Sequence, residues 1–314
     1  MTLVDRKEVG GILLTLVACV CWALYYLAGE FMLHGRTNLD PLTLAFGRFF
    51  IGGIVLFVYL QATHPGRLFQ LTAREFGLVA LMSLFSLVLM SSLLFSGQKY
   101  TSSVNAAMLM SLSPIITLLI GIATKTERPG ILQILGIILT TGGCVILVGD
   151  GQRASFSLAT MKGDLLSLGS AISWGIATVM GKWVITKENS FVVTVWSMIF
   201  ASAFLLVANV VKEIIVPGSI CLPENSLSWG YLAFLGLICT ALAFWAWYAA
   251  LGRARLSTVN ALQNMEPLLA VLLAWILLDS NISPLKWCGI GIAFFGMLIV
   301  ASPSPSPNQN CKGK

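Results

Sequence analysis

The stretch LSTVNALQNMEPLLAVLLAWILL, from Leu256 to Leu278, decides the fold of this chain. Its length and apolar character are those of a membrane-spanning helix, yet it contains four polar residues, Asn260, Gln263, Asn264 and Glu266. The three amides fall on one helical face, and the carboxylate lies at the edge of that face. Polar side chains inside a bilayer are unfavourable unless they face a polar cavity or a partner. We therefore interpret this face as part of a pathway or a site.

A proline on the same face has a counterpart earlier in the chain. Pro267 removes one backbone hydrogen bond and is predicted to kink the helix near the middle of the bilayer. The same design recurs in SSVNAAMLMSLSPIITLLIGIA, where Ser111, Ser113 and Pro114 occupy the equivalent places. The two segments are predicted to form two walls of one cavity.

The composition is that of a polytopic membrane protein. Of 314 residues, 57% are hydrophobic and 10% are charged, whereas roughly a quarter are charged in soluble domains. The net charge of +6 would suggest a nucleic-acid partner in a soluble chain. Here the basic residues lie between apolar runs, so topology explains them and no nucleic-acid binding is expected. The seven cysteines show no paired spacing, and no disulfide framework is expected.

Ten apolar runs are long enough to cross a bilayer, so the predicted fold is an all-α integral membrane protein with ten transmembrane helices. The runs cover approximately residues 11–33, 41–61, 76–97, 101–123, 130–149, 164–186, 191–214, 229–251, 256–278 and 285–302. Lys and Arg are more frequent in the N-terminus and the even-numbered loops. This bias predicts a multi-pass membrane protein with both termini in the cytoplasm. Residues 1–10 and 303–314 are the expected cytoplasmic ends, and the latter is expected to be disordered.

The two halves of the chain repeat. GILLTLVACVCWALYYLAGE, which starts at Gly11, aligns without a gap with GDLLSLGSAISWGIATVMGK, which starts at Gly163. The predicted repeats are 11–149 and 163–302, joined by a loop at 150–162. Because five spans per half is an odd number, the second copy is predicted to be inverted around a central cavity. Inverted repeats place a site near the membrane midplane and allow alternating access.

Five shared features produce a family resemblance. Each half has a Trp in its first span and a Pro in its fourth, and Arg48 lies in the second span; Glu127 and Asp279 follow the prolines, and each final helix contains paired glycines. The chain resembles the EamA family of the drug/metabolite transporter superfamily over nearly its whole length. The resemblance implies a ten-helix inner-membrane carrier, often an exporter of amino acids or other metabolites. Helices one, three, four, six, eight and nine would line the cavity, and five and ten would support it. Met198 stands where the second copy would match Arg48.

The candidate substrate-binding residues lie on four of those helices. They are Trp22, Tyr25, Tyr26, Ser111, Trp174, Thr178, Asn260, Gln263, Asn264 and Glu266. The first helix would supply an aromatic wall and the sixth a wall of smaller residues around Trp174. The alternative is that these aromatics face lipid at the membrane edge. Trp22 lies about 16 Å along its helix, near the midplane, which favours the cavity. Trp245, Trp247 and Tyr248 are instead predicted to form an interfacial belt.

The charges within the spans have separate expected roles. Glu266 is the candidate coupling residue, because an intramembrane carboxylate can exchange protons or meet a cation; the alternative is a structural carboxylate held by Gln263 or a neighbouring helix. Arg48 and Glu30 are predicted to pair as a structural clamp rather than to bind substrate. Lys182 is predicted to extend to the cytoplasm.

Other motifs argue for packing and against catalysis. The serines of the third helix are predicted to allow close helix approach, as are five glycines, Gly136, Gly143, Gly289, Gly291 and Gly296. GIATVMGK, starting at Gly175, imitates a phosphate-binding loop but lacks its spacing and its final Ser or Thr. His34 and His64 lie in separate loops. No catalytic site, metal site or cofactor is expected.

The most favoured function is a secondary transporter that exports a small organic metabolite by alternating access. Amino acids and amphipathic or aromatic amines are the expected substrates, because aromatic rings and Glu266 would attract them. The alternatives are an integral-membrane enzyme, a lipid-handling protein or a channel built on the same cavity. The expected partners are the substrate and the lipid bilayer, and a homodimer remains one candidate assembly.

Overall fold

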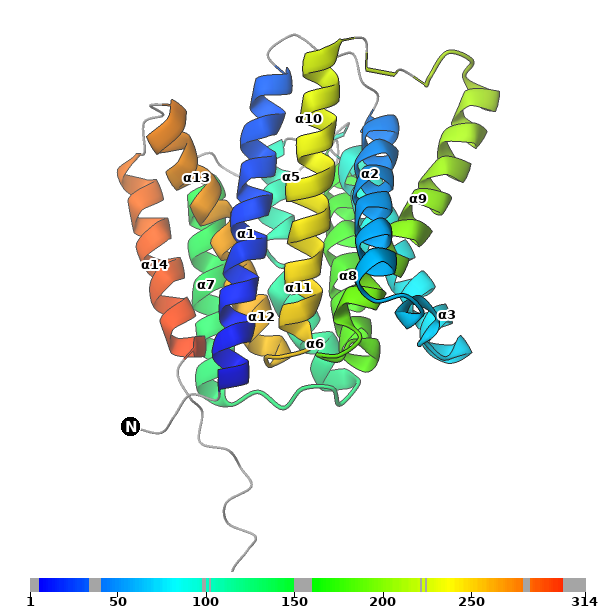
Figure 1. The fold of residues 1–314 in the computed structure, drawn as a ribbon. Coiled ribbons are helices and arrows are strands. Elements are labelled where there is room, and N and C mark those ends of the chain that lie inside the picture. The colour runs from blue at the N-terminus through cyan, green and yellow to red at the C-terminus, as the bar shows by residue number, and fades with distance from the viewer. Residues whose placement is uncertain are drawn as a thin grey trace, which may run out of the picture.

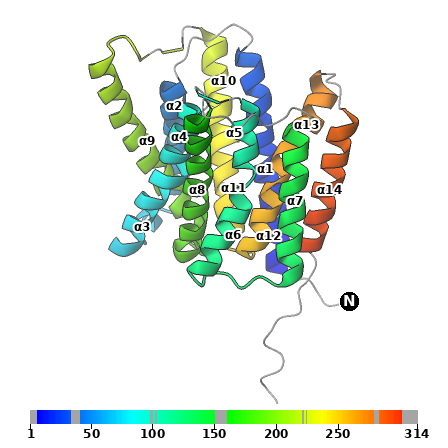
Figure 2. The same ribbon diagram turned by 180° about the vertical axis from the view of Figure 1, so that it is seen from behind.

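The structure is a computed structural model that describes residues 6–33, 41–97, 100–101, 103–149, 160–220, 222–223, 225–278 and 283–301. All regular structure in these ranges is helical (Figures 1 and 2). The predicted connecting loop, up to residue 159, and the predicted tail at 303–314 lie outside them, as do Asp279 and the side chains of Tyr26 and Glu30.

The helices follow one another with few long connections. Their bounds are α1 Arg6–Leu33, α2 Pro41–Thr63, η1 Arg67–Phe69, α3 Ala73–Ser83, η2 Leu84–Leu89, α4 Met90–Gly97, α5 Ser103–Met110, α6 Ser113–Ala123, α7 Ile131–Gly149, α8 Met161–Val184, α9 Ser190–Ile215, α10 Ser226–Gly236, η3 Leu237–Leu242, α11 Ala243–Leu251, α12 Leu256–Gln263, α13 Met265–Leu278 and α14 Pro284–Ala301. Among these, seven continuous stretches are long and apolar enough to cross a membrane, and Pro284–Val300 is a shorter apolar helix. The protein is therefore an all-helical, multi-span membrane protein.

Apolar side chains cover the outside of the bundle as well as its core. Ile214 and Ile215 near the end of α9 are 75% and 72% exposed, and Val207 is 62% exposed. In water such a surface would be unfavourable, but against lipid tails it is not. The exposed aliphatic residues therefore agree with a membrane environment.

Two helices are broken, each immediately before a proline. Pro114 is the second residue of α6, and Pro267 is the third residue of α13. A proline fits the first turn of a helix, where its missing amide hydrogen has no partner to lose. The predicted distortion at each proline is confirmed. Its form is a complete break between two helices, α5 and α6 in one case and α12 and α13 in the other.

Two π-helical segments recur at the same interval as the breaks. The first, η2, begins at Leu84 and the second, η3, begins at Leu237. They are separated by 237 − 84 = 153 residues, and Pro267 follows Pro114 by the same number. Single π-helical turns inside α-helices are uncommon and often lie near functional sites. The two halves of the chain thus carry the same backbone irregularities at matching positions.

The helices α7 and α14 cross closely at one edge of the bundle, where they lie side by side in both views (Figures 1 and 2). A Cβ atom added to Gly136 would lie 2.8 Å from the carbonyl oxygen of Gly296, and one on Gly143 would lie 2.7 Å from that of Gly289. The contacts are reciprocal, because a Cβ on Gly296 or Gly289 would meet the carbonyl of Gly136 or Gly143 at 2.7 and 2.8 Å. The packing role predicted for these four glycines is confirmed.

The fifth glycine of that prediction does not share the crossing. A Cβ added to Gly291 would have no atom within 4 Å. The packing role predicted for Gly291 is therefore wrong. Gly291 lies two residues from Gly289, which places the two on different faces of α14.

Candidate functional site

Four buried aromatic side chains meet between α1, α8 and α11. We call Trp22, Trp174, Phe244 and Trp247 the aromatic cluster. The ring centroid of Trp22 lies 5.8 Å from that of Trp174, 5.4 Å from that of Phe244 and 5.5 Å from that of Trp247. Most of these pairs are tilted or edge-to-face, the arrangements that aromatic quadrupoles favour. The cluster joins the predicted aromatic wall of α1 directly to Trp174 on α8.

The predicted interfacial belt on α11 is wrong. Trp247 is 1% exposed and Tyr248 is 2% exposed, and both pack in the hydrophobic core. Trp245 is half-buried against the same core. The reason is lateral position, because α11 contacts α1, α8, α9 and α12 and is thus surrounded by protein rather than lipid. Nearness to the end of a helix did not place these rings at the membrane surface.

A hydrogen bond links the aromatic cluster to the break in the second half. The indole Nε1 of Trp174 donates to Oε1 of Gln263 at 3.0 Å. Gln263 is the last residue of α12. A buried indole needs an acceptor, and the Gln263 side chain supplies one.

Side chains of α1 and α7 satisfy the backbone at this break. Pro267 has no amide hydrogen to donate to the carbonyl of Gln263, four residues earlier. Cys19 on α1 donates its thiol to the carbonyls of Leu262 and Gln263 at 3.4 and 3.9 Å. Cys144 on α7 donates to the carbonyl of Asn264 at 3.3 Å. The carbonyls that the break frees are thus satisfied from the other half of the chain.

The amide of Asn264 also crosses to the first half. Its Nδ2 donates to Oγ1 of Thr141 on α7 at 3.3 Å, and the residue is buried. A polar side chain at this depth is therefore paired with another helix rather than exposed to lipid. Asn264 binds the two halves together at the break.

Glu266 lies in the first turn of α13, immediately after the break. It is half-buried, and α13 packs chiefly against α1 and also against α7. Cys19 and Cys144, which bond to the carbonyls of the break, lie on those two helices. A carboxylate is favoured at a helix N-terminus by the helix dipole. The residue thus lies at the break and beside two helices that are apolar and long enough to span a membrane.

Asn260 has unused hydrogen-bonding capacity. It is 1% exposed, and within the part of the chain that the structure describes neither Oδ1 nor Nδ2 has a partner. By contrast, Ser111 donates to the carbonyl of Ala107 at 3.0 Å, and Thr178 donates to that of Trp174 at 2.8 Å. These two predicted site residues are satisfied within their own helices. Leaving a buried amide unpaired costs about 1–3 kcal/mol. Such a cost needs an explanation, and a ligand that supplies the missing hydrogen bonds would provide one.

Arg48 on α2 lies beside two aromatic rings. Its Cζ is 5.0 Å from the ring centroid of Tyr25 and 4.7 Å from that of Phe49. Its Nε is buried and has no hydrogen-bond partner among the described residues. Phe49 in turn contacts Phe244 of the aromatic cluster, with 6.0 Å between ring centroids. The predicted clamp with Glu30 involves a side chain outside the described part and stays a prediction.

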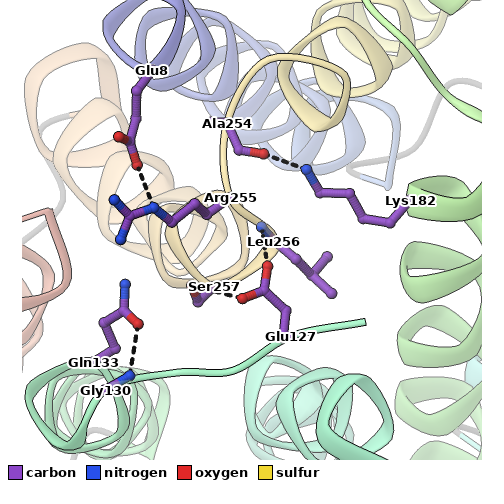
Figure 3. A network of polar contacts seen from close by, with 9 residues as sticks. All are labelled: Glu8, Glu127, Gly130, Gln133, Lys182, Ala254, Arg255, Leu256 and Ser257. Atoms are coloured by element: carbon purple, nitrogen blue, oxygen red, sulfur yellow. Dashed lines mark hydrogen bonds and ion pairs between the residues drawn. The ribbon is translucent and has the colours of Figure 1, made fainter. Parts of the chain in front are cut away.

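A polar network joins the two halves at the end of the bundle where α1 begins, which we call the α1-start end (Figure 3). Glu127, between α6 and α7, accepts a hydrogen bond from the backbone N–H of Leu256 at 2.7 Å and lies 3.5 Å from Oγ of Ser257. It therefore stabilises the N-terminus of α12 with a negative charge. Arg255 forms an ion pair with Glu8 of α1 at 3.4 Å.

Lys182 lies at the same end of the bundle, where its predicted extension to the cytoplasm stays a prediction (Figure 3). Its Nζ donates to the carbonyl of Leu251 at 2.7 Å and to that of Ala254. The ammonium group therefore satisfies carbonyls at the C-terminal end of α11. The carbonyls attract Lys182 because the turn after α11 leaves them without amide partners.

The sequence profile of the EamA-like transporter family matches residues 9–149 and 161–302. This chain belongs to the EamA-like transporter family. The predicted family is thereby confirmed, and the chain is a membrane transporter rather than an enzyme. The two matched segments meet at two places. At the aromatic cluster, Trp22 of the first segment contacts Trp174 of the second. At the α12–α13 break, Cys19 and Cys144 of the first segment bond to backbone carbonyls of the second.

Relatives of this EamA-like protein share its length. An uncharacterized transporter of Archaeoglobus fulgidus is 25% identical over 269 residues, covering 86% of this chain and 89% of its own. A probable amino-acid metabolite efflux pump of Escherichia coli K12 is 25% identical over 306 residues, covering 94% and 95%. A solved structure titled "Crystal structure of protein" has a TM-score of 0.78 at 20% identity, covering 94% of this chain and 97% of its own. That likeness shows a shared fold.

Several residues of the site were not predicted from sequence, namely Phe244, Trp247, Cys19, Cys144, Glu8 and Arg255. One signal could have found the first two. Phe244, Trp247 and Tyr248 recur at spacings of three and four, which places them on one face of a helix and favours a common buried surface. The thiols and the Glu8–Arg255 pair depend on contacts between distant segments, and no local pattern indicates them.

Proposed function

We propose that this EamA-like protein is a secondary transporter that exports a small organic metabolite by alternating access. Its ten spans would form two inverted five-helix repeats, with the α1-start end and both termini in the cytoplasm. The matching intervals of the π-helical segments and the breaks support a duplicated unit. The glycine contacts of α7 and α14 support an inverted relation. Gly136 meets Gly296 while Gly143 meets Gly289, so the final helices of the two repeats cross in opposite chain directions.

The observation that carries the proposal is the break between α12 and α13. Backbone irregularity within a membrane is tolerated where it is buried in protein or lines a polar cavity, and transporters place their sites at such breaks. Around this break lie the aromatic cluster, the Trp174–Gln263 hydrogen bond and the unpaired amide of Asn260. This set suits a small molecule with an apolar or aromatic body and a polar group. The name of the Escherichia coli relative supports an amino acid or a related metabolite.

In this mechanism Glu266 couples transport to proton movement. Because α13 contacts α1 and α7, rocking of the two halves would change the surroundings of Glu266. A carboxylate that is protonated in one state and charged in the other links the two conformations to pH. The contacts of α13 with both halves support this role.

The test is counterflow in proteoliposomes with a metabolite first selected by thermal-shift screening of the purified protein. The wild type should show saturable, pH-dependent counterflow. Glu266→Gln should retain exchange. The difference between its counterflow rates at about pH 5 and about pH 8 should be at least about tenfold smaller than in the wild type. Glu188→Gln, which removes an exposed loop carboxylate, is the matched control and should behave as the wild type. An unchanged pH profile in Glu266→Gln would remove the coupling role, and non-saturable flux would indicate a channel.

A further inference from the structure

Arg48 is a permanent positive charge inside a membrane-spanning helix. It lies seven residues after Pro41, about 10 Å into α2 at 1.5 Å per residue. Among the residues whose side chains are described, no carboxylate pairs with it. A charge at this depth is unfavourable, so it marks a functional site by default.

The surroundings of Arg48 leave its donors available. The rings of Tyr25 and Phe49 lie over its guanidinium at 5.0 and 4.7 Å from Cζ. A cation–π contact uses the charge of the guanidinium and does not provide a hydrogen-bond acceptor for its N–H groups. Nε is buried without a partner among the described residues, and the residue as a whole is partly exposed. A held guanidinium with unused in-plane donors is the group that binds a carboxylate in bidentate fashion.

A run of buried ring-to-ring contacts begins at the same point. Phe49 contacts Phe244 at 6.0 Å, and Phe244 contacts Trp22 at 5.4 Å between ring centroids. From Trp22 the contacts continue through Trp174 to the side chain of Gln263. A ligand held at Arg48 would therefore lay its body toward the aromatic cluster. One guanidinium balances one negative charge, which favours a monocarboxylate over a doubly charged phosphate.

We propose that Arg48 binds the carboxylate of the transported substrate, and that the substrate class is aromatic or apolar monocarboxylates, aromatic amino acids included. This inference rests on the proposed transport function and narrows its substrate. It replaces the structural clamp with Glu30 as the main role of Arg48, and it makes the carboxylate, rather than an amine, the group that the protein selects.

The test measures binding separately from transport. Purified protein is titrated by thermal shift with three probes that share a phenyl ring, namely 3-phenylpropanoate, L-phenylalanine and phenethylamine. Both carboxylates should stabilise the wild type, and the amine should do so much less. Arg48→Gln should weaken the binding of both carboxylates by at least about tenfold, because a charged hydrogen-bonded pair is lost. The affinity for the amine should not change. The carboxylate affinity of Arg48→Lys should fall between those of the wild type and Arg48→Gln, because an ammonium keeps the charge without the bidentate geometry.

Three controls make the result decisive. Arg128→Gln removes an exposed loop arginine and should change nothing. Glu30→Gln should keep the preference for carboxylates. If Glu30→Gln and Arg48→Gln instead lose affinity equally for all three probes, the clamp is established and the proposal is overturned. If Arg48→Gln does not fold, Arg48→Lys still decides, since unchanged carboxylate affinity in that variant contradicts a bidentate site.

The failures of the two proposals are distinguishable. If neither carboxylate stabilises the wild type, the Arg48 assignment is wrong, whatever the transport assay shows. If carboxylates bind through Arg48 but no saturable counterflow occurs in proteoliposomes, the site stands and the transport mechanism is wrong. Counterflow of phenethylamine that is indifferent to Arg48→Gln would support transport and reject only the carboxylate anchor.

Discussion

The two broken helices share one backbone design but differ in their chemistry. At the first break, Ser111 donates to the carbonyl of Ala107, and Thr117 donates to that of Ser113, so the hydroxyls are satisfied within their own segments. At the second break, Gln263 accepts from Trp174 on α8, and Asn264 donates to Thr141 on α7. The first break also contacts α8, because Ser170 donates to Sδ of Met110 at 3.3 Å, but thioether sulfur is a weak acceptor. The second break is connected to α7 and α8 through side-chain amides.

This difference shows how a duplicated scaffold can hold an asymmetric site. A proline follows each break within the first turn of the next helix, and the two prolines occupy matching positions in the two halves. The polar residues around the break do not follow the repeat. At the matching interval of 153 residues, Asn260 corresponds to Ala107 and Gln263 to Met110. Replacing the second-half residues with their first-half counterparts therefore tests which parts of the comparison concern folding and which concern binding.

The largest effect is expected where both halves use the same packing. Gly143→Leu should remove about 3 kcal/mol or more of stability, because its side chain would collide with the α14 backbone at Gly289 and Ala293. The measurement is the thermal unfolding midpoint and the yield of monodisperse protein in detergent. Gly291→Leu is the control, since open space surrounds that position, and its midpoint should stay near that of the wild type. Equal midpoints for Gly143→Leu and the wild type would mean that the α7–α14 crossing is not close-packed.

Local chemistry explains which parts of the architecture could be predicted. Pro114, Pro267, Gly136 and Gly143 act through a missing amide hydrogen or a missing Cβ, and these are properties of the residue itself. The breaks and the crossing could therefore be predicted from sequence. The burial of Trp247 could not, because it depends on which helices surround α11 in three dimensions.

The polar pairs of the site were less predictable for a similar reason. Glu127 is 129 residues from Leu256, and Trp174 is 89 residues from Gln263. Hydrogen bonds between such distant segments depend on the tertiary arrangement, and a pattern of neighbouring residues contains no information about them. The types of residue in the site could be inferred from their unfavourable position in a span, but their partners could not.

The next change should have a small effect on stability and a larger one on binding. Asn260→Ala gives the second half the residue found at the matching place in the first. Because the buried Asn260 amide is unpaired, its removal should change stability by at most about 1 kcal/mol in either direction, with the lost desolvation penalty offsetting the cavity. Binding of the screened metabolite should weaken by about tenfold or more, since a ligand hydrogen bond is lost.

Thermal shift with and without the metabolite separates these two effects. Asn260→Ser provides a control that keeps a small hydrogen-bonding group and should recover part of the affinity. A large loss of unliganded stability with unchanged affinity would assign Asn260 to the fold and would weaken the contrast between the two breaks.

The smallest effect is expected for the hydrogen bond that connects the second break to the aromatic cluster. Trp174→Phe and Gln263→Met each remove one partner of the 3.0 Å bond, and Met is the residue at the matching place in the first half. A double-mutant cycle on unfolding should give a coupling energy of about 1 kcal/mol between the two side chains, because a buried neutral hydrogen bond contributes about that much.

The first break supplies the reference for this cycle. Ser111→Ala removes a hydroxyl that donates to its own helix, and the change should stay within about 0.5 kcal/mol. Combined with Trp174→Phe it should be additive, since Ser111 and Trp174 share no hydrogen bond. Coupling of Ser111 to Trp174 as strong as that of Gln263 would show that both breaks connect to the aromatic cluster. The second half would then not be specialised, and the binding site would extend equally over both copies of the repeat.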